Sequence, residues 1–511
     1  MNQSNLKKLQ NLLKEKDIDI FVINRSDEYL NEYISPNAER LNFITNFSGS
    51  AGRAIITPTD AFLYVDGRYT FQANTQINAK EIQAKHLNNF WTDLEKILLE
   101  EEYKIALDPT LHSIIEIEKV EKMLENSTSQ LQLIDKNFVD LIWENQPKTQ
   151  YTDIFDHPTS FAGQGRREKL DILKKFLDQN EIDHYFVSGL DNIAWLLNLR
   201  ADDIKYTPLL YSYLLISKNN KHSLYIKESS MPEILKKEIQ TLININNIEN
   251  IGSIFNNINS SESIGLDFNS TTFYFLDLLR KQKINTKNLA NPCILLKAIK
   301  NETELDGAKK AHIRDGVSIT KYIYWLKNIM DPKSNDEISV AHHLENLRRK
   351  NELFHSLSFD TISAIDKNAA LPHYRVTEEG KSSFSDNNIY LVDSGGQYFD
   401  GTTDITRTII LGEATKEQKD RFTRVLKGHI ALSNHIFDKG TKGTDIDYLA
   451  RKSLQEINLD YDHGTGHGIG SFLSVHEAPQ RIAKKSMFDS VELLPGMILS
   501  NEPGYYKENE Y

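Results

Sequence analysis

The stretch LVDSGGQYFDGTTDITRT, residues 391–408, contains two aspartates eleven positions apart, Asp393 and Asp404. The run that ends at Asp393 alternates apolar and polar residues up to a Gly-Gly pair, as a strand before a hairpin does, and TTDITRTIIL alternates again. Two adjacent antiparallel strands of this kind would bring both carboxylates to one point. Oxygen ligands suit divalent ions such as Mn²⁺, and a carboxylate can bridge two of them. Aspartate is also abundant at turns, so the pair by itself is more typical of turn and strand-end residues.

A second motif, HGTGHGIGSFLSVHE at residues 463–477, changes that balance. It places His463, His467 and His476 among glycines, where the backbone can approach a ligand closely. Imidazole is a common metal ligand and transfers protons near neutral pH. Because Glu477 joins the three histidines within fifteen positions, we interpret the cluster as a metal or catalytic site. The alternative is a glycine-rich loop that carries surface histidines.

Two further candidates are weak when taken alone. Glu502, in LLPGMILSNEPGYY, follows an apolar run that predicts a strand and precedes a Pro-Gly turn, so the strand would hold its carboxylate rigidly. His373, in NAALPHYRV, lies beside proline and tyrosine, where a histidine is often only packed. Glu502 and His373 become candidate site residues only when they are considered together with the other motifs.

Composition limits the classes of function that the chain can have. Its 511 residues predict two to four domains, and no run approaches the length of a membrane span. The N-terminal sequence predicts an amphipathic helix rather than a secretory signal. A single cysteine, Cys293, excludes an intrachain disulfide and favours a reducing cytoplasm. The net charge of −12 argues against nucleic acid as a partner and favours cationic ligands.

Helical and strand patterns alternate along the chain, which predicts a mixed α/β (α+β) fold. The stretch that begins near residue 167 resembles the N-terminus: in both, an amphipathic helix precedes Ile-Asp, and an aspartate lies nine positions beyond the isoleucine. These are Ile18 and Asp27 in the first copy and Ile182 and Asp191 in the second. We therefore expect a repeated N-terminal fold. The predicted domains are 1–148, 149–298 and 299–511.

Several motifs in order identify a family resemblance. FSGSAG (47–52), DGRY (66–69), DNIAWLLNLR (191–200), DGTTDITRT, VLKGHIALS, GTKG, HGTGHGIGSFLSVHE and EPGYY resemble the Xaa-Pro aminopeptidases, or aminopeptidase P. The resemblance is to the three-domain cytosolic type within the pita-bread metallopeptidases, and it is densest in the last third of the chain. It implies two creatinase-like N-terminal domains followed by a pita-bread catalytic domain.

The resemblance also implies a role for each site residue. Asp393 would bind one metal, Asp404 would bridge two, and His467 and Glu502 would bind the other. The auxiliary histidines His373, His463 and His476 would line the site as catalytic residues, and His373 and His476 would also contact substrate. Arg68, in DGRY, would contact substrate from the N-terminal domain. The implied cofactor is two Mn²⁺ ions, the substrates are peptides with proline second, and the implied assembly is a cytoplasmic homodimer in which Arg68 serves a neighbouring site.

The family pattern contains one further metal-bridging glutamate, about a dozen residues beyond the EPGYY glutamate in a Gly-Ile-Arg-[Ile/Val]-Glu-Asn strand. The sequence given ends at Tyr511, and neither Glu508 nor Glu510 has that context. We expect a catalytic domain that lacks these final strands to expose an unpaired sheet edge, to bind metal weakly and to have little activity.

Two other functions stay open. A prolidase-like Xaa-Pro dipeptidase has the same fold, and dependence on peptide length separates it from an aminopeptidase. An inactive pita-bread module that binds peptides or proteins is the second alternative, although such relatives usually lose several ligands and four are present here.

Overall fold

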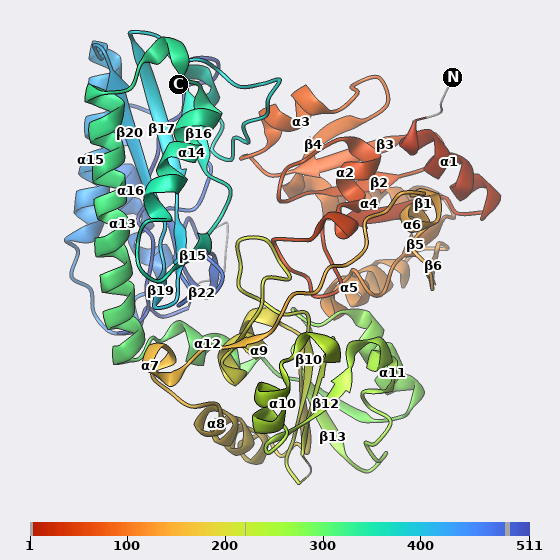
Figure 1. Ribbon diagram of the computed structural model, residues 1–511. Helices are drawn as coiled ribbons and strands as arrows, with labels where there is room; N and C mark the ends of the chain where they lie inside the picture. The colour runs from red at the N-terminus through yellow and green to blue at the C-terminus, as the bar shows by residue number, and fades with distance from the viewer. Residues whose placement is uncertain (1–3, 220, 486–490) are drawn as a thin grey trace. The chain divides into compact units, whose positions relative to one another are not determined.

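The computed structural model describes residues 4–219, 221–485 and 491–511. The chain forms two compact units. The first unit contains residues 1–156, 166–205 and 209–292, and the second contains residues 157–165, 206–208 and 293–511 (Figure 1). Each unit is described separately below, and the predicted domain boundaries at 148 and 298 stay predictions.

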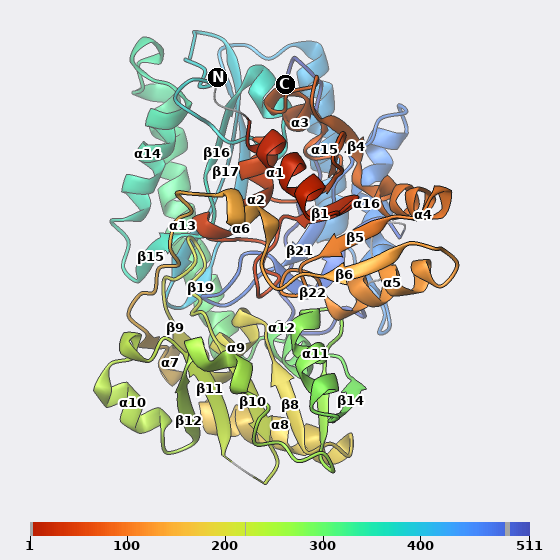
Figure 2. The same cartoon turned by 90° about the vertical axis from the view of Figure 1, so that its right-hand side faces the viewer.

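The first unit contains two six-stranded sheets of identical topology. The first sheet, in the order β4-β3-β2-β1-β5-β6, consists of β1 (Ile20–Asn24), β2 (Arg53–Ile56), β3 (Ala61–Val65), β4 (Gln83–His86), β5 (Lys104–Leu107) and β6 (Gln130–Leu133). The second sheet, in the order β12-β11-β10-β8-β13-β14, consists of β8 (His184–Val187), β10 (Tyr213–Ser217), β11 (His222–Ile226), β12 (Ile243–Asn247), β13 (Ser263–Leu266) and β14 (Asn285–Asn288). Figure 2 shows β12, β11, β10 and β8 in that sequence.

Corresponding strands of the two sheets run in the same relative directions. Counted along the chain, the first strand of each sheet (β1 or β8) pairs antiparallel with the second strand and parallel with the fifth. The pairs at the two sheet edges, third with fourth and fifth with sixth, are parallel. The expected repeat of the N-terminal fold is therefore confirmed, although only short stretches of the two copies look alike in sequence.

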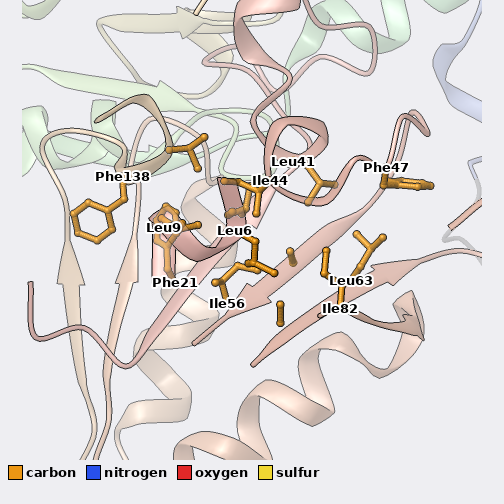
Figure 3. Close-up of a cluster of buried hydrophobic side chains, with 14 of the residues drawn as sticks. Leu6, Leu9, Phe21, Leu41, Ile44, Phe47, Ile56, Leu63, Ile82 and Phe138 are labelled. Carbon is orange, nitrogen blue, oxygen red and sulfur yellow. The ribbon is translucent and has the colours of Figure 1, made fainter. Parts of the chain in front are cut away.

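Helices cover each sheet with apolar faces. The first repeat has α1 (Asn5–Glu15), α2 (Arg40–Thr45), α3 (Thr70–Gln76), α4 (Phe90–Glu100), α5 (Ile114–Leu124) and α6 (Phe138–Ile142). The second repeat has α8 (Arg166–Gln179), α9 (Leu190–Leu197), α10 (Glu233–Ile239) and α11 (Phe273–Lys281). Figure 3 shows Leu6 and Leu9 of α1 and Leu41 of α2 within the same buried cluster as Ile56 and Leu63 of the sheet. This helical spacing of leucines is what predicts α1 from the sequence. A short pair, β7 (Phe155–Asp156) and β9 (Leu199–Arg200), completes the first unit.

The two repeats contact each other through equivalent segments. Ile114 N–H donates to the Thr271 carbonyl (3.0 Å), and Phe273 N–H donates to the His112 carbonyl (3.0 Å). The two bonds are related by one shift of 159 positions along the chain, so each repeat gives and receives the same bond. Ser113 and Thr272, the residues that precede α5 and α11, form the antiparallel bridge at the centre of this contact.

In its described residues, the second unit contains four longer α-helices, two short ones and three small sheets. Its helices are α7 (Thr159–Ala162), α12 (Pro292–Ala298), which begins at the last residue of the first unit, α13 (Glu302–Asn328), α14 (Glu337–Arg348), α15 (Lys416–Ser433) and α16 (Gly443–Gln455). Its sheets are β15 (Phe354–Leu357) with β18 (Gly396–Tyr398) and β19 (Gly401–Thr402); β16 (Ile362–Ile365) with β17 (Asn388–Ser394) and β20 (Ile405–Leu411); and β21 (Gly466–Gly468) with β22 (Glu477–Ile482).

Helix α13 begins where the sequence predicts it. Asn301 accepts hydrogen bonds from the backbone N–H groups of Thr303 and Glu304, and the Glu304 carboxylate accepts one from Asn301 N–H, which is a complete capping box. Figure 1 shows α13 running alongside the sheet of β16, β17 and β20. Its residues Ile319 and Tyr322 belong to the same core cluster as Tyr390 of β17.

The expected hairpin at Gly395–Gly396 is wrong in one respect. Strands β17 and β20 do pair antiparallel, but β18 and β19 form a small hairpin between them. The physical reason for Gly395 is close approach rather than a turn: a Cβ there would lie 1.9 Å from the Thr403 carbonyl oxygen. Only glycine lets these two backbone segments come so close.

Within the described residues, no helix combines the length and the apolar character that a membrane crossing requires.

Candidate metal centre

The paired strands bring Asp393 and Asp404 together. Asp393 lies on β17 opposite Thr406 of β20, and Asp404 comes just before β20 begins. Burial is the largest influence on Asp393, and the charges of Asp404 and Glu502 act in the same direction, so its pKa is well above the ordinary value. Its Oδ1 atom is buried and has no hydrogen-bond partner in the described part of the chain. A buried carboxylate oxygen without a partner is costly unless a cation completes it.

His467 stands between two other carboxylates. Its Nε2 atom lies 3.2 Å from Asp404 Oδ2 and 3.1 Å from Glu502 Oε1. Its Nδ1 atom lies 2.9 Å from the Gly468 carbonyl oxygen, which can only accept, so Nδ1 carries a hydrogen. In the neutral imidazole this leaves the Nε2 lone pair facing the carboxylates, as a metal-binding histidine requires.

The backbone beside β21 fixes Glu502. Ser500 N–H donates to the His467 carbonyl (2.8 Å), and Glu502 N–H donates to the Thr465 carbonyl (2.8 Å). The Ser500 hydroxyl donates to Glu502 Oε1 (2.7 Å). The predicted strand before Glu502 is wrong: residues 491–502 form isolated bridges, one of them Gly468 with Leu499. Even so, these hydrogen bonds fix the position of the backbone and of the Glu502 carboxylate.

The glycines of HGTGHG serve this backbone contact rather than approach to a ligand. A Cβ on Gly466 would lie 2.1 Å from the Ser500 carbonyl oxygen, and one on Gly468 would lie 2.4 Å from the Glu477 carbonyl oxygen. The close approach at Gly466 allows the segment that carries Glu502 to lie against β21, and the one at Gly468 allows β22 to pair closely with β21. The expectation that glycine spacing marks a site is therefore useful, but its physical reason is different.

The centre contains three carboxyl groups and one imidazole, so it has more acidic groups than basic ones. Burial opposes the charged form of His467, yet hydrogen bonds to Asp404 and Glu502 outweigh it and hold its pKa well above the ordinary value. Burial opposes ionisation of Glu502 as well, but the bond and charge of His467 lower its pKa to about 2. A proton on His467 thus supplies positive charge that a divalent cation would supply better. Three carboxylates and one imidazole are a donor set that suits Mn²⁺ and similar ions.

Two further histidines lie against this centre. His463 Nδ1 lies 2.7 Å from the Gly464 carbonyl oxygen, so its Nε2 accepts a hydrogen bond from the Tyr506 hydroxyl (2.8 Å). The His476 ring meets the His467 ring edge to face, with centroids 4.4 Å apart. Both histidines are half-buried.

Known proteins match this chain along nearly its whole length. Residues 306–511 match Metallopeptidase family M24, and residues 5–136 and 145–304 each match a Creatinase/Prolidase N-terminal domain. A probable Xaa-Pro aminopeptidase P from Sordaria macrospora is 38% identical over 98% of this chain and 84% of the relative. A probable Xaa-Pro aminopeptidase P from Neosartorya fischeri is also 38% identical, over 99% of this chain and 79% of the relative.

The chain belongs to the Xaa-Pro aminopeptidase P family. Its fold matches that of X-prolyl aminopeptidase from Caenorhabditis elegans, described as a cytosolic enzyme with a di-nuclear active site, with a TM-score of 0.92. That structure is 29% identical in sequence, and the match covers 99% of this chain and 85% of the worm enzyme. A prolidase from Pyrococcus horikoshii, with a TM-score of 0.54 and 24% identity, shows a related fold. The chain is accordingly a metallopeptidase with two creatinase-like domains.

The family resemblance also assigns His373 and Arg68 to the site. His373 is half-buried in the turn that follows a 3-10 helix at Asp366–Ala370. Arg68 lies in the first unit, after β3, where its guanidinium binds both carboxylate oxygens of Asp66 (3.0 and 2.8 Å). Their predicted contacts with substrate stay predictions.

Glu477 is wrongly grouped with the histidines. Its side chain is 1% exposed and accepts hydrogen bonds from Lys297 Nζ (2.8 Å) and from Lys300 Nζ. It is therefore a buried ionic anchor between β22 and α12. His476 and Glu477 are neighbours in sequence, and successive residues at a strand point to opposite faces.

The residues that support the centre are harder to see from the sequence. Arg451 of α16 donates to the carbonyls of Tyr461 (2.6 Å) and His463 (2.8 Å) and to Asp447 Oδ2 (2.6 Å). Tyr506 lies within EPGYY, so that motif is a signal for it. Arg451 has no such signal, because an arginine and an aspartate four positions apart on a helix usually form a surface pair.

Proposed function

We propose that this protein removes the N-terminal residue from peptides whose second residue is proline, at a site that holds two divalent metal ions, preferably Mn²⁺. The observation that carries the proposal is the meeting of Asp404, His467 and Glu502 beside the partnerless oxygen of Asp393. The family and the dinuclear worm enzyme support it. The same relative, together with the reduced state expected of the buried Cys293, supports a place in the cytoplasm.

The four ligand residues divide into two groups. Asp393 would hold one ion, Asp404 would bridge both, and His467 and Glu502 would hold the second. Divalent ions bound there supply Lewis acidity, which lowers the pKa of a water molecule and polarises the carbonyl of the scissile bond. The chain itself supplies oriented oxygen and nitrogen donors, fixed by the backbone bonds at Ser500 and Gly468.

Proton transfer falls to the histidines. The Nε2 atom of His463 faces the Tyr506 hydroxyl, and its Nδ1 hydrogen is held by the Gly464 carbonyl, so the ring has one defined orientation. An imidazole fixed in this way beside Glu502 is proposed to shuttle protons during the reaction, with the Tyr506 hydroxyl as its hydrogen-bonded neighbour. His373 and His476 are proposed to contact the substrate and to help stabilise the charge that develops on its carbonyl oxygen.

Selectivity for proline follows from its amide. The bond before proline has no N–H, so a site that reads shape can accept it where peptidases that need that donor cannot. The free α-amine of the substrate would find favourable surroundings in an acidic protein, whose net charge is −12. Arg68 is proposed to add a contact from a creatinase-like domain, in a homodimer.

The test is titration of the metal-free protein with Mn²⁺, followed by hydrolysis of an Arg-Pro-Pro peptide. We expect release of free arginine that depends on Mn²⁺ and disappears with Asp404→Ala. Absence of metal-dependent cleavage in the parent protein, under conditions in which it is folded, would overturn the proposal. The expectation of weak metal binding stays a prediction, and the same titration measures it.

A prolidase-like dipeptidase is the alternative that shares this geometry. It would cleave an Xaa-Pro dipeptide faster than a tripeptide or longer peptide with the same N-terminus, whereas an aminopeptidase retains activity on the longer ones. The inactive binding module predicts instead that peptide binds in equal measure to the parent protein and to Asp404→Ala, with no cleavage by either.

A further inference from the structure

A fully buried ion pair contacts the neighbours of both aspartates at the metal centre. Arg348, the last residue of α14, donates from Nε to Asp315 Oδ1 (2.6 Å) and from Nη2 to Asp315 Oδ2 (3.1 Å). Asp315 lies within α13, and both side chains are 0% exposed. Such a bidentate arginine–carboxylate pair has a defined geometry as well as a charge.

Each member of the pair reaches one of the two ligand segments. Arg348 Nη2 also donates to the carbonyl of Ser394 (3.3 Å), the residue after Asp393. The hydroxyl of Thr403, the residue before Asp404, donates to Asp315 Oδ2 (2.6 Å). One ion pair therefore holds the backbone next to both aspartates.

Thr403 also ties the two segments directly to each other. Its hydroxyl accepts a hydrogen bond from Gly396 N–H (2.9 Å), and its carbonyl accepts one from the Ser358 hydroxyl (2.8 Å). The close approach of Gly395 to the Thr403 carbonyl leaves no room for either segment to slide. The spacing between Asp393 and Asp404 thus depends on the hydrogen bonds that the ion pair makes with Ser394 and Thr403.

Stability alone does not account for this pair. A buried ion pair is often no more stabilising than apolar residues of similar volume, because both charges lose their hydration. Arg348 also keeps its Nη1 atom buried without a hydrogen-bond partner in the described residues. The ion pair carries this energetic cost and is bonded to the neighbours of both aspartates. These observations point to a role in holding the two ligands.

We propose that Arg348 and Asp315 are positioning residues that fix the separation of Asp393 and Asp404 and thereby set the affinity of the centre for divalent metal. The inference rests on the proposed function, since it assumes that the two aspartates bind metal. Residues that orient metal ligands typically change metal affinity by about 10- to 100-fold when they are replaced.

The decisive variant replaces both charges, as Arg348→Met with Asp315→Leu. Removing the pair together leaves no unpaired buried charge, so the domain is expected to fold. Circular dichroism and the unfolding midpoint of the metal-free protein establish that it has. Calorimetric titration with Mn²⁺ should then show an affinity at least about 10-fold below that of the parent.

Thr403 gives a finer test that leaves the ion pair in place. Thr403→Val removes the hydroxyl that binds Asp315 and Gly396, whereas Thr403→Ser retains it. We expect Thr403→Val to lose about 10-fold in Mn²⁺ affinity and Thr403→Ser to stay close to the parent. If the double variant does not fold, this pair of variants decides the question.

A matched control comes from the first unit, where Arg40 binds Asp140 through the same bidentate geometry (2.8 and 3.0 Å). Arg40→Met with Asp140→Leu should leave Mn²⁺ affinity unchanged. If the parent binds Mn²⁺ and the Arg348, Asp315 and Thr403 variants bind it equally well, the positioning role is overturned while the proposed function stands. If the folded parent binds no Mn²⁺, both claims fall.

Discussion

The carboxylate side and the imidazole side of the metal centre are each held by a buried arginine, but in different ways. Arg348 binds the carbonyl of Ser394, next to Asp393, and its partner Asp315 accepts a hydrogen bond from the hydroxyl of Thr403, next to Asp404. Arg451 binds the carbonyl of His463 itself and lies 3.8 Å from the centroid of the Tyr461 ring. The first arrangement fixes a distance between two ligands, and the second fixes the loop of a proton-transfer residue. Metal affinity and turnover should therefore respond to different substitutions.

The largest effect is expected from Asp404→Ala. It removes the carboxylate that faces both Asp393 and His467, so the loss of Mn²⁺ affinity should exceed the about 10- to 100-fold seen for residues that only orient ligands. Calorimetry and peptide hydrolysis measure the two losses. Asp438→Ala, at an exposed position after α15, is the control and should change neither. Retained metal binding in Asp404→Ala would remove Asp404 from the centre.

His463→Gln should lower turnover without lowering metal affinity. Loss of a general acid or base lowers kcat by about 10²- to 10⁴-fold, whereas Mn²⁺ affinity should stay close to that of the parent. His435→Gln, in the segment after α15, serves as the matched control. A parallel fall in metal affinity would show that His463 is a ligand and that the separation drawn here is wrong.

Arg451→Lys tests the second arginine. Lysine keeps the charge but not the planar fork that reaches Asp447, Tyr461 and His463 together. We expect kcat to fall by about 10-fold with Mn²⁺ affinity unchanged, the reverse of the pattern expected for Thr403→Val. A fall in Mn²⁺ affinity with kcat unchanged, as expected for Thr403→Val, would contradict this role of Arg451.

Tyr506→Phe should have a smaller effect. Burial, with the charges of Glu502 and Asp393, raises the pKa of Tyr506, so its hydroxyl stays a donor to His463 at ordinary pH. Loss of one hydrogen bond of about 0.5–1.5 kcal/mol corresponds to a fall in kcat of about 2- to 10-fold. Tyr505→Phe, the preceding tyrosine of the motif, is the comparison, and equal losses would exclude a specific role for the Tyr506 hydroxyl.

The smallest effect on the centre is expected from Glu477→Gln, despite its position next to His476. Two buried lysines lose the carboxylate that both contact, so the free energy of unfolding should fall by about 3–5 kcal/mol. Below the unfolding temperature, kcat and Mn²⁺ affinity should match the parent. A specific loss of metal affinity would return Glu477 to the site.

The sequence predicts what depends on local periodicity. Strand alternation before Asp393 and after Asp404 indicates that the two carboxylates meet, and Asn301 with Glu304 marks the start of α13. The small hairpin of β18 and β19 escapes prediction, because a Gly-Gly pair has the same composition whether it turns or packs tightly. Arg348 and Asp315 lie 33 positions apart on two helices, and no periodic pattern shows that they meet.

The paired bonds between residues 112–114 and 271–273 have the reciprocity of an isologous dimer interface, in which each copy offers the other the same surface. Here both copies belong to one chain. Covalent joining keeps the second copy at a high effective concentration, so association no longer depends on how much protein the cell makes. The two repeats keep the same strand order and the same reciprocal backbone contact, although only short stretches of them look alike in sequence.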